Sequence, residues 1–277
     1  MGKSVGLIGN FKGKLGNTVG YKVSLSNSGT NQGVRVYQLN IRNPKSAAQA
    51  EQRAKYAPIF ATYRALKMII DRGNESKPYG NASRIAWLKK AFRSSIIPWT
   101  PQGSTVKFPV GCQLTQGSLH NVDFTVQIDT LKIAAPSIKG QQTFSEMSEL
   151  VGFLFENYPF LKKGDQFTLV VAKIQSQSLQ FKVESYIMDP DDKTPIHGWG
   201  CETGQIVYNG DNVIIGAAII ISREGSHGEH LRSTSFLTIY EGRQRVPPYD
   251  DASKQAAIAS YMANDSANAD WAEESIQ

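Results

Sequence analysis

Short runs with the pattern of β-strands recur between about residue 104 and residue 240, with turn signals between them. Apolar residues recur with a two-residue period in some of these runs, which is typical of strands that bury one face. Examples are Val106 and Phe108, Phe124, Val126 and Ile128, and Phe181 and Val183. So many short strands at this spacing predict an antiparallel β-sandwich or barrel. Gly210 and Asp211 separate two of the runs and predict a tight hairpin. The candidate strands are Thr105–Phe108, Gln113–Leu114, Phe124–Ile128, Leu131–Ile133, Gln166–Ile174, Gln180–Met188, Gln205–Asn209, Asn212–Ser222 and Leu231–Tyr240.

One helix interrupts this strand pattern and runs from Ser145 to about Tyr158. Glu146 and Glu149 lie in its first turns, where carboxylates interact favourably with the helix dipole. Pro159 follows the predicted end of the helix.

The first part of the chain is built differently. Residues 1–18 contain five glycines with lysines between them, which disfavours a helix and permits close backbone approach. Val19–Leu25 and Gly33–Ile41 then alternate apolar and polar residues on either side of the turn cluster SNSGTNQ. This pattern predicts a β-hairpin, on which Lys22, Arg35 and Arg42 are expected to form a basic face.

Two basic helices are predicted after the hairpin. Asn43 and Pro44 are a helix start signal, and Gly73 is a plausible end. Pro58 is expected to divide this first helix into pieces near 44–57 and 58–72. Its predicted buried stripe is Ile59, Tyr63, Leu66 and Ile70.

The second basic helix is predicted from Ala82 to about Ser95. About ten residues connect the two helices, more than the three or four of a helix-turn-helix motif, so that motif is disfavoured. The apolar stripe expected for this second helix is Ile85, Leu88, Phe92 and Ile96.

Together these patterns predict an α+β fold. An N-terminal β-hairpin arm and an α-helical hairpin are expected to pack on an antiparallel β-sandwich or barrel. The predicted regions are a basic arm, hairpin and two helices in residues 1–100, the sandwich in residues 101–248, and an acidic Ala-rich tail in residues 249–277. The tail is expected either to dock on a basic patch or to remain disordered.

The distribution of charge is the strongest indication of function. Residues 1–100 contain 17 basic and 3 acidic residues, a net charge of +14, whereas the remaining 13 basic and 21 acidic residues give the rest a net charge of −8. Such asymmetry favours an anionic partner or an acidic neighbouring subunit, with a merely solvated basic surface as the alternative. The predicted residues that contact nucleic acid or a partner are Lys12, Lys14, Lys22, Arg35, Arg42, Lys45, Arg53, Lys89, Lys90 and Arg93.

Aromatic residues interleaved with lysine and arginine can stack on single-stranded bases. In this part of the chain most of them fall on predicted apolar stripes, which favours core packing instead. The aromatic residues concerned are Tyr21, Tyr37, Tyr56, Tyr63, Tyr79 and Trp87.

The residues that could carry catalysis or bind metal form no recognisable set. His227 and His230 lie three residues apart, but the spacing matches no standard zinc pattern. Asp189–Asp192 lacks the order of an EF-hand loop and is read as an acidic turn. No GxSxG motif or Ser/His/Asp set is present, so no catalytic residue, metal or cofactor is predicted. Cys112 and Cys201 are expected to be free thiols, and no apolar run has the length of a membrane span.

Two motifs in the first 70 residues resemble those of a family of uncharacterised proteins from Bacteroidetes genomes and their phages. The family pattern K-G-x-L-G-N-x-V-G-Y is matched at residues 12–21, and its N-P-x-T-x-A-Q-x-x-Q-R-like helix start is matched at residues 43–53, with Ser46 in place of Thr. The resemblance implies a phage or prophage context and no catalytic activity. The matching residues are Lys12, Gly13, Leu15, Gly16, Asn17, Val19, Gly20, Tyr21, Asn43, Pro44, Ala48, Gln49, Gln52 and Arg53.

The leading hypothesis is therefore a non-enzymatic virion structural protein, present in the host cytoplasm before assembly. Its basic N-terminal region would contact DNA, RNA or acidic faces of other virion subunits or of its own copies. One alternative is a soluble phage-encoded nucleic-acid-binding protein. Another is a carbohydrate-binding β-sandwich protein, which needs an aromatic platform on the sandwich face.

Overall fold

The computed structural model describes residues 13–15, 18–25, 29–36, 46–175, 178–210, 213–226, 228–240, 242 and 250–266, with side chains from residue 46 to residue 263. The chain splits into two compact units, Met1–Lys45 and Ser46–Gln277. The predicted helices therefore share a unit with the β-rich region, and the boundary lies near residue 45 rather than near residue 100.

The first unit contains an antiparallel meander of three strands, β1 (Gly13–Leu15), β2 (Thr18–Leu25) and β3 (Gly29–Val36). The predicted hairpin is confirmed as the β2–β3 pair. Leu25 pairs with Gly29, so β3 begins inside the predicted turn cluster. The short strand β1 is an addition that the apolar pattern did not predict. Residues 37–41, the end of the predicted second strand, lie outside the described residues.

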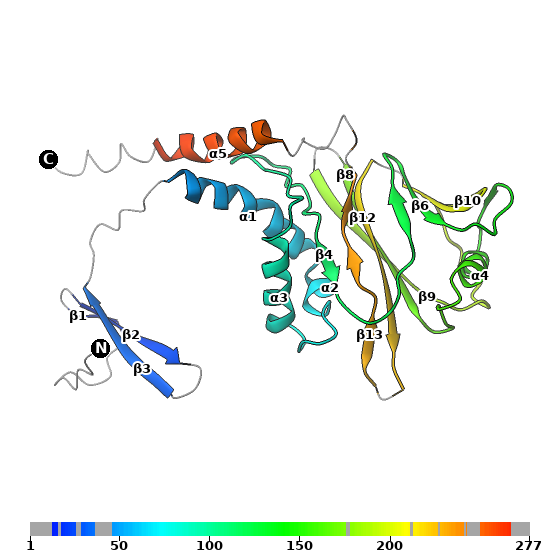
Figure 1. Ribbon diagram of the computed structural model, residues 1–277, viewed down its shortest axis with the longest axis horizontal. Helices are drawn as coiled ribbons and strands as arrows, with labels where there is room; N and C mark the ends of the chain where they lie inside the picture. Colours follow the sequence, from blue (N-terminus) through cyan, green and yellow to red (C-terminus); the bar gives the residue numbers. More distant parts are fainter. Residues whose placement is uncertain are drawn as a thin grey trace. The chain divides into compact units, whose positions relative to one another are not determined.

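The second unit has three layers, and its central layer is a five-stranded antiparallel sheet in the order β13-β12-β8-β9, with β15 also paired to β12 (Figure 1). The strands β8 and β12 are buried on both faces because side chains alternate between the two neighbouring layers. The strands of this sheet are β8 (Gln166–Gln175), β9 (Ser178–Ile187), β12 (Ile214–Glu224), β13 (His230–Arg232) and β15 (Thr238–Ile239).

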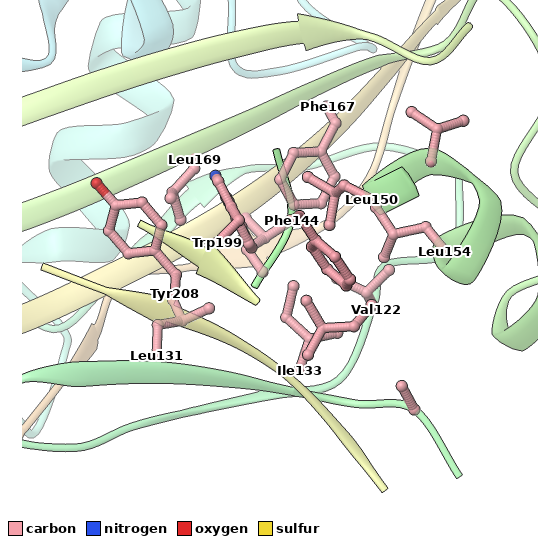
Figure 2. Packing of buried hydrophobic residues seen from close by; sticks show 14 of the residues in the cluster. Val122, Leu131, Ile133, Phe144, Leu150, Leu154, Phe167, Leu169, Trp199 and Tyr208 are labelled. Carbon is pink, nitrogen blue, oxygen red and sulfur yellow. The ribbon is translucent and has the colours of Figure 1, made fainter. Parts of the chain in front are cut away.

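The second layer is an antiparallel sheet in the order β5-β6-β11-β10-β7, accompanied by the helix α4 (Met147–Asn157). Figure 2 shows the core between this layer and the central sheet, where Trp199 lies against Phe167 and Tyr208. The ring centroids of Trp199 and Tyr208 are 4.9 Å apart. The strands of this layer are β5 (Phe124–Val126), β6 (Thr130–Ala134), β7 (Gln142–Thr143), β10 (Trp199–Glu202) and β11 (Gln205–Asn209).

The third layer consists of helices, and all of them except α5 contribute side chains to the core on the opposite face of the central sheet (Figure 1). The predicted buried stripe of the first helix is confirmed, because Ile59, Tyr63, Leu66 and Ile70 are all buried against β8 and β12. The helix α5 packs along α1, and Lys254 of α5 lies 3.3 Å from Glu51 of α1. The helices are α1 (Ala47–Ala65), α2 (Lys67–Asp71), α3 (Asn81–Ala91) and α5 (Asp251–Ser266).

Pro58 does not break the first helix, so that prediction was wrong. The helix α1 runs through Pro58 without interruption and ends at Ala65, and the break falls at Leu66. The hydroxyl of Thr62 donates to the carbonyl of Pro58 at 2.9 Å, which gives this carbonyl a partner within the helix. The helix begins at Ala47 with Ser46 as its cap, since the Ser46 hydroxyl accepts from the N–H of Gln49.

The stripe predicted for the second helix was half wrong, because only Leu88 and Phe92 of its four residues pack against the core. Ile85 and Ile96 are exposed, whereas Ser83, Trp87 and Ala91 are buried. Ser83 is small enough to let α3 approach α2, and its hydroxyl donates to the carbonyl of Ile70 at 2.7 Å. A residue pattern based on large apolar side chains misses a contact face of this kind.

Two of the predicted β features were wrong. Thr105–Phe108 forms no strand, and the strands on either side of Gly210 do not form a hairpin. They belong to different sheets, since β11 pairs with β6 and β10 whereas β12 pairs with β8. The remaining short strands β4 (Gln113–Thr115) and β14 (Ser235–Phe236) form a separate two-stranded sheet.

The predicted α+β class is confirmed, with helices packed on antiparallel sheets, and the sheets are open rather than closed into a barrel. Within the described residues, no helix is long and apolar enough to span a membrane.

Candidate nucleic-acid interface

Three aromatic rings gather where α1 lies beside α3. Tyr56 stacks on Phe60 with ring centroids 5.2 Å apart, and meets Phe92 edge-on at 4.6 Å. Tyr56 is 45% exposed, and Phe60 and Phe92 are half-buried. Rings presented in this way could stack on the flat faces of bases.

Basic side chains flank these rings on both helices. Arg64 lies one helical turn beyond Phe60 on α1, and Lys89 lies three residues before Phe92 on α3. Arg93 follows Phe92 directly, and all three basic residues are exposed. We call this surface the α1–α3 seam, and it consists of Tyr56, Phe60, Phe92, Arg64, Lys89 and Arg93.

The seam arises from the way in which α1 is buried. Ala50 and Ala54 are buried on one side of α1, whereas Ile59 and Tyr63, which lie about 140–180° round the helix from Ala54, are buried against the central sheet. Tyr56, Phe60 and Arg64 follow one another at four-residue spacing and form a row between these two buried sides. The row therefore stays at the surface of the helix.

The three acidic residues of this part of the chain are already occupied. Glu51 lies 3.3 Å from both Lys55 and Lys254, and the hydrogen bond from Lys55 holds the pKa of Glu51 below its ordinary value. Asp71 is buried and accepts a hydrogen bond from the hydroxyl of Tyr63 at 3.1 Å. Neither Glu51 nor Asp71 therefore neutralises the seam.

Glu75, the third acidic residue, is bound to the β-rich part of the unit. Burial alone would raise its pKa, but hydrogen bonds from the backbone of Arg232 and from the backbone and hydroxyl of Ser118 outweigh burial and lower the pKa. Gly117 permits this approach, because a Cβ there would lie 2.2 Å from the carbonyl of Arg232.

The helices therefore carry a surplus of exposed positive charge. Among the residues whose side chains are described, no ion pair involves any of six exposed basic residues on or beside α1–α3. A surface of this composition attracts polyanions. The six residues are Arg64, Lys67, Arg72, Lys77, Lys89 and Arg93.

The ten predicted contact residues do not all lie on one surface. Lys89 and Arg93 lie on the seam, and Arg53 is half-buried on α1. Lys90 instead turns inward: it donates to Gln113 Oε1 at 2.9 Å and to Gln116, and burial lowers its pKa.

The other six predicted residues belong to the first unit. Lys12, Arg42 and Lys45 lie outside the described residues. The register pairs Lys14 with Val19 and Val19 with Arg35, which puts positions 14 and 35 on one face of the meander. Lys22 pairs with Gln32 of β3, and no side chain is described in this unit, so the predicted basic face stays a prediction.

The interpretation of the aromatic residues as core was half right. Tyr63 and Trp87 are buried, but Tyr56 and Tyr79 are 45% and 65% exposed. Tyr79 carries the guanidinium of Arg72 over its ring at 5.1 Å. No side chain is described for Tyr21 or Tyr37. The sequence reasoning missed Phe60, although the four-residue spacing of Tyr56, Phe60 and Arg64 was visible in the sequence.

Metal binding finds no support in the described part of the chain. This part contains no group of three His, Cys, Asp or Glu residues that could hold a metal ion. The acidic turn is structural, since Asp189 and Asp191 both lie 2.9 Å from Lys163 and Asp192 accepts from Thr194. His227 lies outside the described residues.

A carbohydrate platform would need exposed aromatic rings on the sandwich. Trp199 is 1% exposed and Tyr208 is 3% exposed, so neither offers a free ring face. The hollow above them is lined by polar residues such as Gln142 and Asn209 together with Gly200.

Comparison of this chain with protein-family models, with curated proteins and with solved structures finds no match. The seam must therefore be interpreted from its own chemistry.

Proposed function

We propose that the chain is a non-enzymatic bacteriophage virion structural protein whose basic N-terminal region contacts nucleic acid or acidic faces of other subunits. The observation that carries this proposal is the α1–α3 seam, where exposed aromatic rings lie between basic side chains that no described acidic residue neutralises. The phage context rests on the two N-terminal motifs alone.

Nucleic acid fits the seam better than an acidic protein surface does. A protein partner needs positive charge only, whereas Tyr56, Phe60 and Phe92 supply stacking surfaces between the charges. Single strands expose base faces that a duplex hides, so single-stranded DNA or RNA is the favoured ligand.

A soluble nucleic-acid-binding protein of the infected cell is the second candidate, because the same seam would serve it. Particle composition separates the two. Mass spectrometry of purified particles should find this chain in a fixed number of copies if it is structural. Its absence from particles, together with its presence in infected cells, would remove the virion proposal and favour the second candidate.

Binding itself is tested by fluorescence anisotropy with labelled single-stranded DNA and RNA. Affinity should fall steeply between about 50 mM and about 200 mM salt, since phosphate contacts release counterions. No binding at the lower salt concentration would remove both nucleic-acid proposals and leave an acidic protein face as the partner.

A further inference from the structure

The strand β9 forms an unusually long free edge of the central sheet. It has 10 residues and, among the strands that the structure describes, pairs with β8 alone. The other strands at the ends of the two five-stranded sheets are short: β13 and β5 have 3 residues each and β7 has 2. Short edge strands protect a sheet from pairing with other chains, and β9 lacks this protection.

The other protective devices are also missing from β9. Its register with β8 is continuous from Ser178 to Ile187, with no bulge, and the strand contains no proline. Its one lysine, Lys182, is neutralised by Glu184 at 2.5 Å, and this hydrogen bond raises the pKa of Lys182. Within the described residues, no backbone hydrogen bond is made to the outer edge of β9.

The two faces of β9 differ in character. On one face, Glu184 accepts from the hydroxyl of Tyr186 at 2.6 Å, while Lys182 donates to the hydroxyl of Tyr208 at 3.2 Å. This face is thereby fixed to the second sheet. On the other face, Val183 is 45% exposed and Ile187 is 63% exposed.

We propose that two copies of this chain associate by antiparallel pairing of β9 with β9, with Val183 on the twofold axis. In this register Leu179 lies opposite Ile187 of the second copy, and Val183 lies opposite its own equivalent. On the other face, Lys182 lies opposite Glu184 of the second copy. Each interface then has two cross-strand charge pairs of opposite sign and three apolar pairs, two of Leu179 with Ile187 and one of Val183 with Val183, all of which stabilise antiparallel strands. Phe181 lies opposite Ser185 between the apolar pairs.

Neighbouring registers are less favourable. Symmetry places a residue opposite itself at the centre of the pair. A register centred on Lys182 would oppose two ammonium groups, and one centred on Glu184 would oppose two carboxylates, which is destabilising. A register centred on Phe181 leaves Ile187 without a partner and puts Lys182 opposite Gln180. The sequence of β9 is therefore self-complementary in the Val183 register.

This association would join the two central sheets into one continuous sheet. The inference goes beyond nucleic-acid binding and does not depend on it, because no residue of the α1–α3 seam lies on β9. Loss of self-association and loss of nucleic-acid binding are therefore separate outcomes.

The first test is sedimentation velocity of the full chain over a concentration series. The wild-type chain should dimerise, and Val183→Lys should weaken the dimer about tenfold or more, because two ammonium groups would meet on the axis. The matched control is Ile128→Lys, which adds the same charge at a residue of similar exposure, 47%, outside β9. Far-UV circular dichroism confirms that both variants are folded.

The second test checks the register by exchanging charges. Lys182→Glu and Glu184→Lys should each dimerise poorly alone, since each variant opposes like charges across the interface. Mixed together, the two variants should form a heterodimer, because every cross-strand charge pair is then of opposite sign. Equal association of each variant with itself and with the other would overturn the Val183 register.

Two results would overturn the proposal as a whole. One is a wild-type chain that stays monomeric at every concentration, since the two β9 strands would then not pair. The other is a dimer whose dissociation constant Val183→Lys leaves unchanged. Protection of residues 178–187 that rises with protein concentration would support the proposal.

Discussion

Replacing Arg223 with Leu should destabilise the second unit by about 3 kcal/mol, because it leaves a buried carboxylate without its charged partner. Asp165 is 1% exposed, and Arg223 holds it with two hydrogen bonds, Nε to Oδ1 at 2.6 Å and Nη2 to Oδ2 at 2.7 Å. The same guanidinium donates to the carbonyl of Phe160 at 2.9 Å. It thereby ties β12 to the loop that follows α4.

The expected loss of about 3 kcal/mol follows from the cost of leaving one partner of a buried ion pair without the other. Removing one partner of a buried ion pair typically costs about 3–5 kcal/mol. The side chain of Arg223 is 21% exposed, so water can partly replace it and the lower end of that range applies. Asp165 also keeps the hydrogen bond from the N–H of Lys162 at 2.9 Å. Replacing both Asp165 and Arg223 with Leu should cost less than the sum of the single changes, since no charge is then stranded.

Urea unfolding followed by tryptophan fluorescence measures these differences, because Trp87, Trp99 and Trp199 all lie in the second unit. The control is Lys163→Leu, which removes an exposed pair with Asp189 and Asp191 and should not change the midpoint. A loss of less than about 1 kcal/mol for Arg223→Leu would refute the view that Asp165 depends on this partner.

Two further predictions concern titration and reactivity. The pKa of Glu75 is lowered in the folded chain, so the stability that Glu75 contributes should be complete above about pH 4.5, the ordinary pKa of a glutamate. This contribution should be lost as the pH falls through the pKa of Glu75 in the folded state. Glu75→Gln should therefore lower the urea midpoint at pH 7, and its difference from the wild-type midpoint should shrink at acid pH. Cys112 and Cys201 are buried, and burial raises the pKa of Cys112 to about 12. Iodoacetamide should therefore modify neither thiol until the chain is unfolded, which mass spectrometry of the treated native protein would show. Rapid labelling of the folded chain would contradict this prediction.

The fold class could be predicted from the sequence because its signals are local and strong. The stripe of Ile59, Tyr63, Leu66 and Ile70 consists of large apolar side chains at helical spacing, and it does face the core. The long strands β8 and β12 were also predicted from local signals, because strand-like runs with turn signals between them stand at these positions.

Features that depend on tertiary contacts could not be predicted. The buried face of α3 contains Ser83 and Ala91, whose small size matters only because another helix approaches there. Turn residues at 210 and 211 indicate a change of direction, but they do not say whether the chain returns to the same sheet. The two-residue strand β7 is too short to show a period.

The seam was partly predictable. The surplus of basic residues in the first 100 positions was evident in the composition, and two of the predicted contact residues, Lys89 and Arg93, are exposed. The outward position of Tyr56 was not evident from the sequence, because it depends on how Phe92, which directly follows α3, packs against Tyr56 of α1. Likewise, the sequence does not distinguish Lys90 from the adjacent Lys89. Lys90 is turned inward because it donates a hydrogen bond to Gln113, which lies 23 residues further along the chain.

The most direct test of the account is a pair of salt titrations with labelled single-stranded DNA. One variant replaces the seam residues Arg64, Lys89 and Arg93 with Ala, and the control replaces three exposed lysines of the sandwich, Lys139, Lys162 and Lys193, with Ala. Since each phosphate contact contributes about 0.7 to the slope of log K against log salt concentration, the seam variant should lose about 2 from the wild-type slope and the control should lose none. Equal slopes for the two variants would contradict the claim that the seam is where this protein meets a polyanion.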